Sequence, residues 1–278
     1  TALGHAIRTG EYRPGEELVV WVKKTSGNGK RPVVLMDVQD RVVQKAASMV
    51  LRTMLDGRFD PLSFAFRPGR TREHAIAVAG VLAVGGHPVW LTHDLKDAFG
   101  RVPVPRLLDI FFKILPCPRL RDFLGLVLPP RSPSLGGIKQ GGPLSPLALE
   151  LYLTHFLHEP WRKAAHPARV VRYADDLLLT ATDVDAAGAA DDALRTLLGP
   201  TGMVLKATFG EAVRDIREAP AEWLGFVIRS STTGIAAAAV TGSSASFGSP
   251  RSWRRASITV WNSLRWTLLV KLRPWETL

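Results

Sequence analysis

The feature that most constrains this chain is a pair of adjacent carboxylates between two apolar runs. Asp175 and Asp176 come soon after Val170-Val171 and directly before Leu177-Leu178-Leu179. Apolar runs on both sides of a polar pair predict a β-hairpin whose strands pack against a core and whose turn carries the carboxylates, even without an Asn-Gly or Asp-Gly turn. Such a hairpin requires a covered sheet around it.

A third carboxylate is expected beside this pair. Asp94 ends another apolar, strand-like run, residues 89–94. Carboxylates that gather at the ends of neighbouring strands suit a hard divalent cation, which prefers oxygen ligands. The sequence therefore predicts a metal site made by Asp94, Asp175 and Asp176. The alternative is three aspartates that only cap turns or form ion pairs.

Strand-like and helix-like segments alternate along the chain. Runs 18–22 and 31–36 flank a turn rich in Gly and Ser, which predicts a second β-hairpin. Asp37 is an N-cap for a following helix, and Ser145-Pro146 opens another with a capping hydroxyl. Strands separated by helices predict an α+β fold. Further helices are expected over 71–83, 105–115, 147–157 and 184–198.

The balance of charge points to a polyanionic partner. The 278-residue chain has 36 Lys and Arg against 25 Asp and Glu, a formal charge of +11, which favours nucleic acid over a merely solvated basic surface. The only cysteine is Cys117, so no intrachain disulfide is available and a reducing compartment is expected. We expect no membrane partner, because no apolar run approaches the roughly 20 residues of a membrane span. A start at Thr1 suggests a processed or partial chain.

The C-terminal part differs from the rest in composition. Residues 230–250 are rich in Ser, Thr, Gly and Ala and are expected to form a loop or linker. Residues 251–276 combine arginines with tryptophans. They form either a small helical module that faces nucleic acid or buried tryptophans under a solvated basic face.

Several short motifs occur together along the chain. They are Asp94-Leu95-Lys96-Asp97-Ala98-Phe99, Gln140-Gly141-Gly142-Pro143-Leu144-Ser145-Pro146, Tyr173-Ala174-Asp175-Asp176, the blocks around Arg31, Arg41 and Phe64–Arg70, and Trp223-Leu224-Gly225-Phe226. Taken together and in order, they resemble the motifs of reverse transcriptases of the group II intron-type branch, which includes CRISPR-associated and other domesticated bacterial relatives.

The resemblance implies a right-hand polymerase with fingers at 1–88, a palm at 89–228 with an antiparallel sheet packed on helices, and a linker with a short, mostly helical thumb-like segment at 229–278. A helical segment at about 105–135 returns to the fingers. The resemblance also implies a cytoplasmic location of bacterial type.

The resemblance implies roles around the incoming nucleotide. Asp94, Asp175 and Asp176 would be the catalytic ligands of two Mg²⁺ ions, with Mn²⁺ as a substitute and Asp176 as the weaker ligand. Phe99 would be a steric gate against a 2′-hydroxyl, so dNTPs are preferred. The remaining nucleotide-binding residues are Asp97 and Ala98 through their backbone N–H groups, Gln140 at the sugar and templating base, and Lys24 with Arg31 at the triphosphate, where Lys23 or Lys30 could replace Lys24.

Other residues have a weaker basis in the pattern. Arg67 and Arg70 would hold the template, and Trp223, Leu224 and Gly225 the primer. Lys206 is a candidate general acid for pyrophosphate. Lys139 stands where intron-type enzymes usually have proline before the glutamine. His155 and His158 are expected on a helix surface rather than as metal ligands.

The function predicted is an RNA-directed DNA polymerase that extends a primer 3′-hydroxyl by two-metal-ion catalysis. Its partners would be an RNA template, a DNA or RNA primer, dNTPs and, given the short thumb, a fused or associated domain. The alternatives are an RNA-dependent RNA polymerase and a catalytically silent nucleic-acid-binding scaffold. Intron mobility, CRISPR spacer acquisition and phage defence all remain open as the biological setting.

Overall fold

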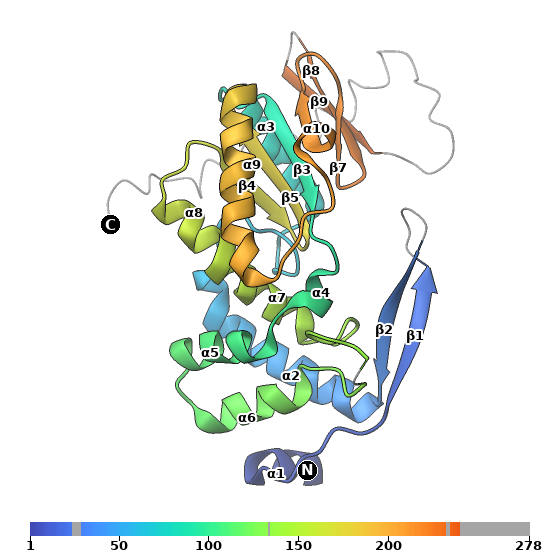
Figure 1. The fold of residues 1–278 in the computed structure, drawn as a ribbon. Helices are drawn as coiled ribbons and strands as arrows, with labels where there is room; N and C mark the ends of the chain where they lie inside the picture. Colours follow the sequence, from blue (N-terminus) through green and yellow to red (C-terminus); the bar gives the residue numbers. More distant parts are fainter. Residues whose placement is uncertain (24–28, 133, 232–233, 240–278) are drawn as a thin grey trace.

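The structure is a computed structural model, and it describes the chain except for residues 24–28, 133, 232–233 and 240–278. The described part divides into a mainly helical half and a half built on sheets (Figure 1). None of its helices is long and apolar enough to cross a membrane. Helices of the first half are α1 (Ala2–Thr9), α2 (Val38–Leu55), α4 (Ala98–Arg101), α5 (Val104–Ile114), α6 (Pro118–Val127) and α7 (Ser145–Leu153).

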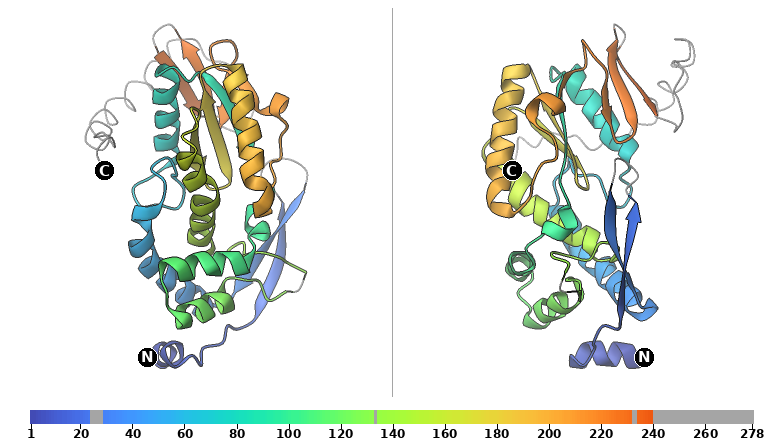
Figure 2. Two further views of the ribbon diagram at one scale, coloured as in Figure 1. Left: turned by 60° about the vertical axis from the view of Figure 1, so that its left-hand side comes forward. Right: turned by 45° about the vertical axis from the view of Figure 1, so that its right-hand side comes forward.

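A two-stranded hairpin stands beside the helical half. Its strands, β1 (Glu17–Lys23) and β2 (Lys30–Met36), are antiparallel and lead from the helices toward the sheet half, as Figure 2 shows. Valine-rich strands flanking a turn predicted this hairpin, and the structure confirms it. The hairpin is followed directly by α2, for which Asp37 is the N-cap residue without a side-chain cap bond.

The central sheet has four antiparallel strands in the order β4-β5-β3-β6. Val89 and Leu91 pack on one face with α9, and Trp90 packs on the other face with α3, so side chains alternate as strand geometry requires. The α+β prediction is confirmed. The elements are β3 (Val89–Asp94), β4 (Arg169–Tyr173), β5 (Asp176–Ala181), β6 (Val213–Asp215), α3 (Arg72–Val84) and α9 (Val184–Leu198).

Helix α3 packs on the central sheet. Its residues Ala75 and Ile76 share a buried cluster with Trp90, Val171 and Leu178 of the sheet. Its apolar face covers the side of the sheet opposite α9. The boundary between fingers and palm near residue 88 stays a prediction.

A long helical rod crosses between the two halves. Helix α7 continues as one π-helical turn at Thr154–His158 and then as α8 (Glu159–Lys163). Ser145 is the first residue of α7 rather than its cap, because Leu144 is the N-cap and the buried Ser145 hydroxyl has no hydrogen-bond partner. The predicted capping hydroxyl is therefore wrong, although the predicted start is right.

A third sheet follows the central one in the order β7-β8-β9. Strand β9 (Gly234–Ala239) corrects the prediction that residues 230–250 form only a loop, and it pairs with β8 (Phe226–Ser231), which pairs with β7 (Ala221–Trp223). The predicted helical thumb falls outside the described residues. The short remaining elements are α10 (Phe209–Ala212) and two 3-10 turns, Asp56–Arg58 and Gly199–Thr201.

Candidate active site

Three aspartates meet where strands β3 and β5 pair. Asp94 is the register partner of Asp176, and Asp175 lies in the two-residue turn between β4 and β5. The Leu95 N–H donates to the Asp175 carbonyl over 3.0 Å, which fixes the turn to the end of β3. Ala174 takes φ 59 to close the turn without glycine. The structure thus brings the predicted third carboxylate to the other two.

The carboxylates repel one another. Burial, followed by the charges of Asp175 and Asp94, raises the pKa of Asp176 to about 7. Burial and the charge of Asp94 also raise the pKa of Asp175, while Lys206 and Arg31 oppose the rise. The Lys206 ammonium forms an ion pair with Asp94 Oδ2, so this candidate general acid lies at the carboxylates. Such a crowded acidic cluster at strand ends marks a site for positive charge.

The donor set fits a hard divalent cation. Asp94 Oδ1 is buried without a hydrogen-bond partner, and the three side chains offer only carboxylate oxygens. In the described part of the chain, no three His, Cys, Asp or Glu side chains lie close enough together to hold a metal ion as they stand. Binding of a metal ion by the three aspartates stays a prediction.

The segment after β3 turns back sharply at the site. Asp97 adopts a left-handed conformation with φ 52 and is the N-cap of the short helix α4, which begins at Ala98. Phe99 is half-buried, and its carbonyl accepts a 2.9 Å hydrogen bond from the Ile138 N–H. The predicted gate residue is therefore tied by its backbone to the segment that leads into Gln140.

The Gln140 loop lies against the hairpin. The Gln140 carbonyl accepts a hydrogen bond of 2.8 Å from the Val34 N–H of β2. Gly141 has φ 107, and a Cβ there would come within 3.0 Å of the Val34 carbonyl, so only glycine suits this approach. Arg31, also on β2, is close enough to oppose the rise in the pKa of Asp175. Lys24 lies outside the described residues.

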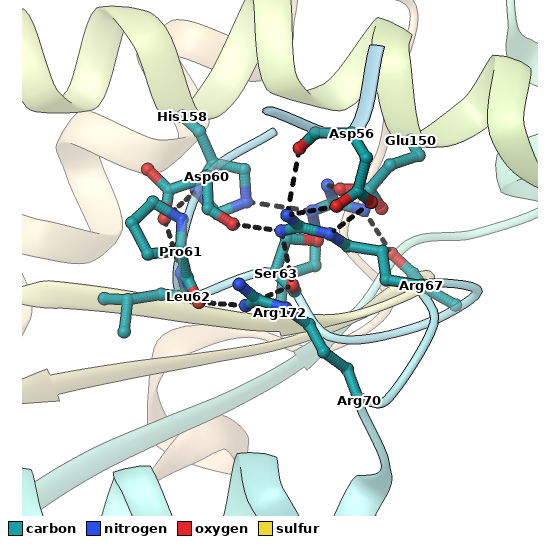
Figure 3. Close-up of polar contacts among 11 residues, drawn as sticks. Asp56, Asp60, Pro61, Leu62, Ser63, Arg67, Arg70, Glu150, His158 and Arg172 are labelled. Carbon is teal, nitrogen blue, oxygen red and sulfur yellow. Dashed lines mark hydrogen bonds and ion pairs between the residues drawn. The ribbon is translucent and has the colours of Figure 1, made fainter. Parts of the chain in front are cut away.

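Arg67 has a different role from the one predicted. Its five N–H donors all bond to protein: to the Asp56 carboxylate and carbonyl and to the carbonyls of Asp60 and Ser63, at 2.7–3.3 Å (Figure 3). Its side chain is 4% exposed. We therefore correct the expectation that Arg67 contacts the template, because no donor is left for a phosphate. Arg70 is only partly buried and packs over the Phe64 ring, and its contact with the template stays a prediction.

Beside Arg67 lies a buried ionic cluster that sequence reasoning missed (Figure 3). Arg172 on β4 is fully buried, pairs with Glu150 of α7 at 2.8 Å and donates from Nε to His158 Nε2 at 2.9 Å. It also donates to the Ala174 carbonyl at 3.2 Å, one residue before Asp175. Glu150 and Arg172 are each a single charge inside an apolar run, and this pattern could have predicted a buried ion pair.

The predicted surface position of His158 is also wrong. It was expected on a helix surface, but its residue is 3% exposed, because the π-helical turn rotates it inward. Burial and the neighbouring Arg172 charge lower its pKa well below the ordinary value, so the ring is neutral and accepts from Arg172. His155 stays about one-third exposed, near Glu159.

The predicted primer-binding motif forms the turn of the β7–β8 hairpin. Trp223 pairs with Phe226 across the strands, and Leu224 and Gly225 both have positive φ, at 52 and 76, as a type I′ turn requires. Trp223 is buried at 3% and packs with Trp90 of the central sheet in one cluster. The turn is thereby held on the face of the sheet that carries α3.

The comparisons with known proteins agree with this geometry. Residues 22–228, more than half of the chain, match the family model of the reverse transcriptase (RNA-dependent DNA polymerase). Protein YkfC of Escherichia coli (strain K12) is 27% identical over 167 residues, 55% of this chain and 44% of YkfC. Group II intron-encoded protein LtrA of Lactococcus lactis subsp. cremoris is 22% identical over 161 residues, 53% of this chain and 26% of LtrA.

Among solved structures, a telomerase from Candida albicans in complex with a fragment of telomeric RNA matches with a TM-score of 0.56 and 12% identity, over 83% of this chain and 47% of that one. This likeness is one of fold. The chain spans less than half the length of the curated relatives it matches. By its sequence and its fold, the chain belongs to the reverse transcriptase family.

Proposed function

We propose that this chain is an RNA-directed DNA polymerase that extends a primer 3′-hydroxyl with dNTPs. The observation that carries the proposal is the register of β3 and β5, which places Asp94 opposite Asp176 and beside the turn that holds Asp175. Burial and the neighbouring carboxylates raise the pKa of Asp175 and of Asp176, and a fold has little reason to keep such a cluster unless a cation binds there.

Asp94 and Asp175 would hold the metal ions, with Asp176 as a weaker ligand. Two Mg²⁺ ions bound there would activate the primer hydroxyl and stabilise the charge of the leaving pyrophosphate. Arg31 would contact the triphosphate, since its charge already acts on Asp175 and opposes the rise in the pKa of that carboxyl. Phe99 would exclude a 2′-hydroxyl through the bulk of its ring.

The test is extension of a labelled primer on an RNA template with Mg²⁺ and dNTPs. The chain should extend the primer, and Asp175→Ala should abolish extension. Asp192→Ala is the matched control, because Asp192 is an exposed aspartate on α9 and should leave activity unchanged. A wild-type chain that extends no primer across a range of primers and salt concentrations would contradict the proposal.

The first alternative is an RNA-dependent RNA polymerase, which shares the carboxylate chemistry. The half-buried Phe99 beside Asp97 and Ala98 favours deoxynucleotides instead. Phe99→Ala should increase rNTP incorporation. Equal use of rNTPs and dNTPs by the wild-type chain would refute the gate assignment. The second alternative, a silent scaffold, predicts nucleic-acid binding with no extension at all.

A further inference from the structure

A buried ion pair joins the base of the β1–β2 hairpin to the Gln140 loop. Lys139 Nζ lies 2.6 Å from Glu17 Oε1, and the two side chains are 1% and 4% exposed. Glu17 is the first residue of β1, and Lys139 directly precedes Gln140. The pair therefore lies directly beside Gln140, a residue that the proposed function places at the nucleotide.

Lys139 is the middle residue of a three-residue bridge. On one side the Ile138 N–H donates to the Phe99 carbonyl at 2.9 Å, and on the other the Gln140 carbonyl accepts from the Val34 N–H at 2.8 Å. Two residues predicted to line the nucleotide site, Phe99 and Gln140, are therefore connected through Lys139. Any shift of Lys139 must move one or both of them.

Lys139 is held by its backbone and by its side chain. Its N–H donates to the Leu128 carbonyl at 2.9 Å, and its ammonium forms the buried ion pair with Glu17. The side-chain anchor of the bridge therefore depends on Glu17.

Glu17 is itself anchored on both of its oxygens. Oε2 accepts a 2.8 Å hydrogen bond from the Arg131 N–H, on the other arm of the loop, while Oε1 faces Lys139. Arg131 in turn donates to the carbonyls of Pro14 and Gly15 just before β1. One carboxylate thus fixes both arms of the loop to the strand that leads into the hairpin carrying Arg31.

We propose that the Glu17–Lys139 ion pair is a positioning device that sets the spacing between Phe99, Gln140 and the β1–β2 hairpin, and thereby determines discrimination between deoxyribose and ribose in the incoming nucleotide. The inference rests on the proposed function. Neither residue touches the nucleotide in this role. Both act through the backbone of residues 138–140, because a gate excludes a 2′-hydroxyl only when the opposite wall of the sugar pocket is held at a fixed distance.

Stability and selectivity can be separated here. A buried ion pair is often replaced by apolar residues of similar size without loss of stability. The double variant Glu17→Leu/Lys139→Met, which also loses the hydrogen bond from the Arg131 N–H, is therefore expected to stay folded and melt close to the wild-type temperature while losing the fixed spacing. A merely structural pair would show the opposite, with selectivity unchanged wherever the fold is intact.

The experiment is single-nucleotide primer extension with dNTP and rNTP, alongside thermal melting. For the double variant we expect the KM for dNTP to rise about tenfold and the preference for dNTP over rNTP in kcat/KM to fall about tenfold, since small misplacements of aligned groups cost this much or more. The single variant Lys139→Arg keeps the positive charge and should therefore retain most of the wild-type preference for dNTP over rNTP. Arg121→Gln, which breaks an exposed ion pair with Asp109, is the control and should change neither quantity.

The outcomes are distinguishable. An active wild type whose double variant keeps its KM and its sugar preference within twofold overturns the inference and leaves the proposed function standing. A wild type that incorporates no nucleotide refutes the proposed function and the inference together. If the double variant fails to fold, the isosteric Glu17→Gln decides by the same two readouts.

Discussion

Replacing Asp176 with asparagine should stabilise the metal-free protein, and only above a certain pH. Asp176 faces Asp94 across the strands and follows Asp175, and burial with these two charges raises its pKa to about 7 from the ordinary 3.8. Between these two values the unfolded chain has an ionised carboxylate while the folded chain keeps it protonated. Folding therefore takes up a proton, and the stability of the wild type falls as pH rises through this range.

The magnitude follows from the two pKa values. Their difference, from 3.8 to about 7, corresponds to roughly 4 kcal/mol at about 1.36 kcal/mol per pKa unit. Asp176 is partly exposed, and solvent screening reduces this to about 2–3 kcal/mol. Asparagine has the same shape and no charge. Its advantage should be near zero at pH 4, grow up to pH 7 and stay constant above it, where it corresponds to a rise in Tm of roughly 5 °C.

The assay is thermal melting of wild type and Asp176→Asn from pH 4 to 8, with a chelator present. Contributions from His158 and other groups are common to both proteins and cancel in the difference. Adding Mg²⁺ should raise the Tm of the wild type more at pH 8 than at pH 6, because the cation binds the ionised carboxylates. A difference between the two proteins that does not vary with pH would refute the reasoning.

Two further predictions concern the surroundings of the site. Arg172→Met should cost about 3–5 kcal/mol because it leaves the buried Glu150 charge unpaired, and adding Glu150→Leu should restore most of that loss; a single variant that melts with the wild type would contradict this. Gly137→Ala should cost about 2–3 kcal/mol more than Gly69→Ala, as measured by denaturation. The two glycines share positive φ near 70, but a Cβ on Gly137 alone would meet backbone, at 2.2 Å from the Phe99 carbonyl oxygen. An equal loss of stability in the two variants would show that the backbone around Gly137 moves to accommodate the Cβ, and would contradict the prediction.

The sequence predicts those parts of the fold that depend on local pattern. Alternating apolar runs place the two hairpins, and the order of the aspartates places Asp94 beside Asp176. What the sequence does not predict depends on contacts between distant segments. Arg67 looks like an exposed template ligand until Asp56 is seen to occupy its guanidinium, and only the structure shows that α3 packs against Trp90 of the central sheet.

The strand ends that carry the carboxylate cluster are held in place by buried polar contacts of the neighbouring residues on β3 and β4. On β3, His93 next to Asp94 is buried and lies 2.7 Å from Asp191 of α9, which in turn pairs with Arg195. On β4, Arg172 donates to the carbonyl of Ala174 next to Asp175 and pairs with Glu150. Burial and the charges of Asp175 and Asp94 raise the pKa of Asp176 to about 7, and the part of this cost that is repulsion would otherwise push the two strand ends apart. The strands instead keep the spacing at which Asp94 and Asp176 face each other, so the charge repulsion remains available to favour cation binding.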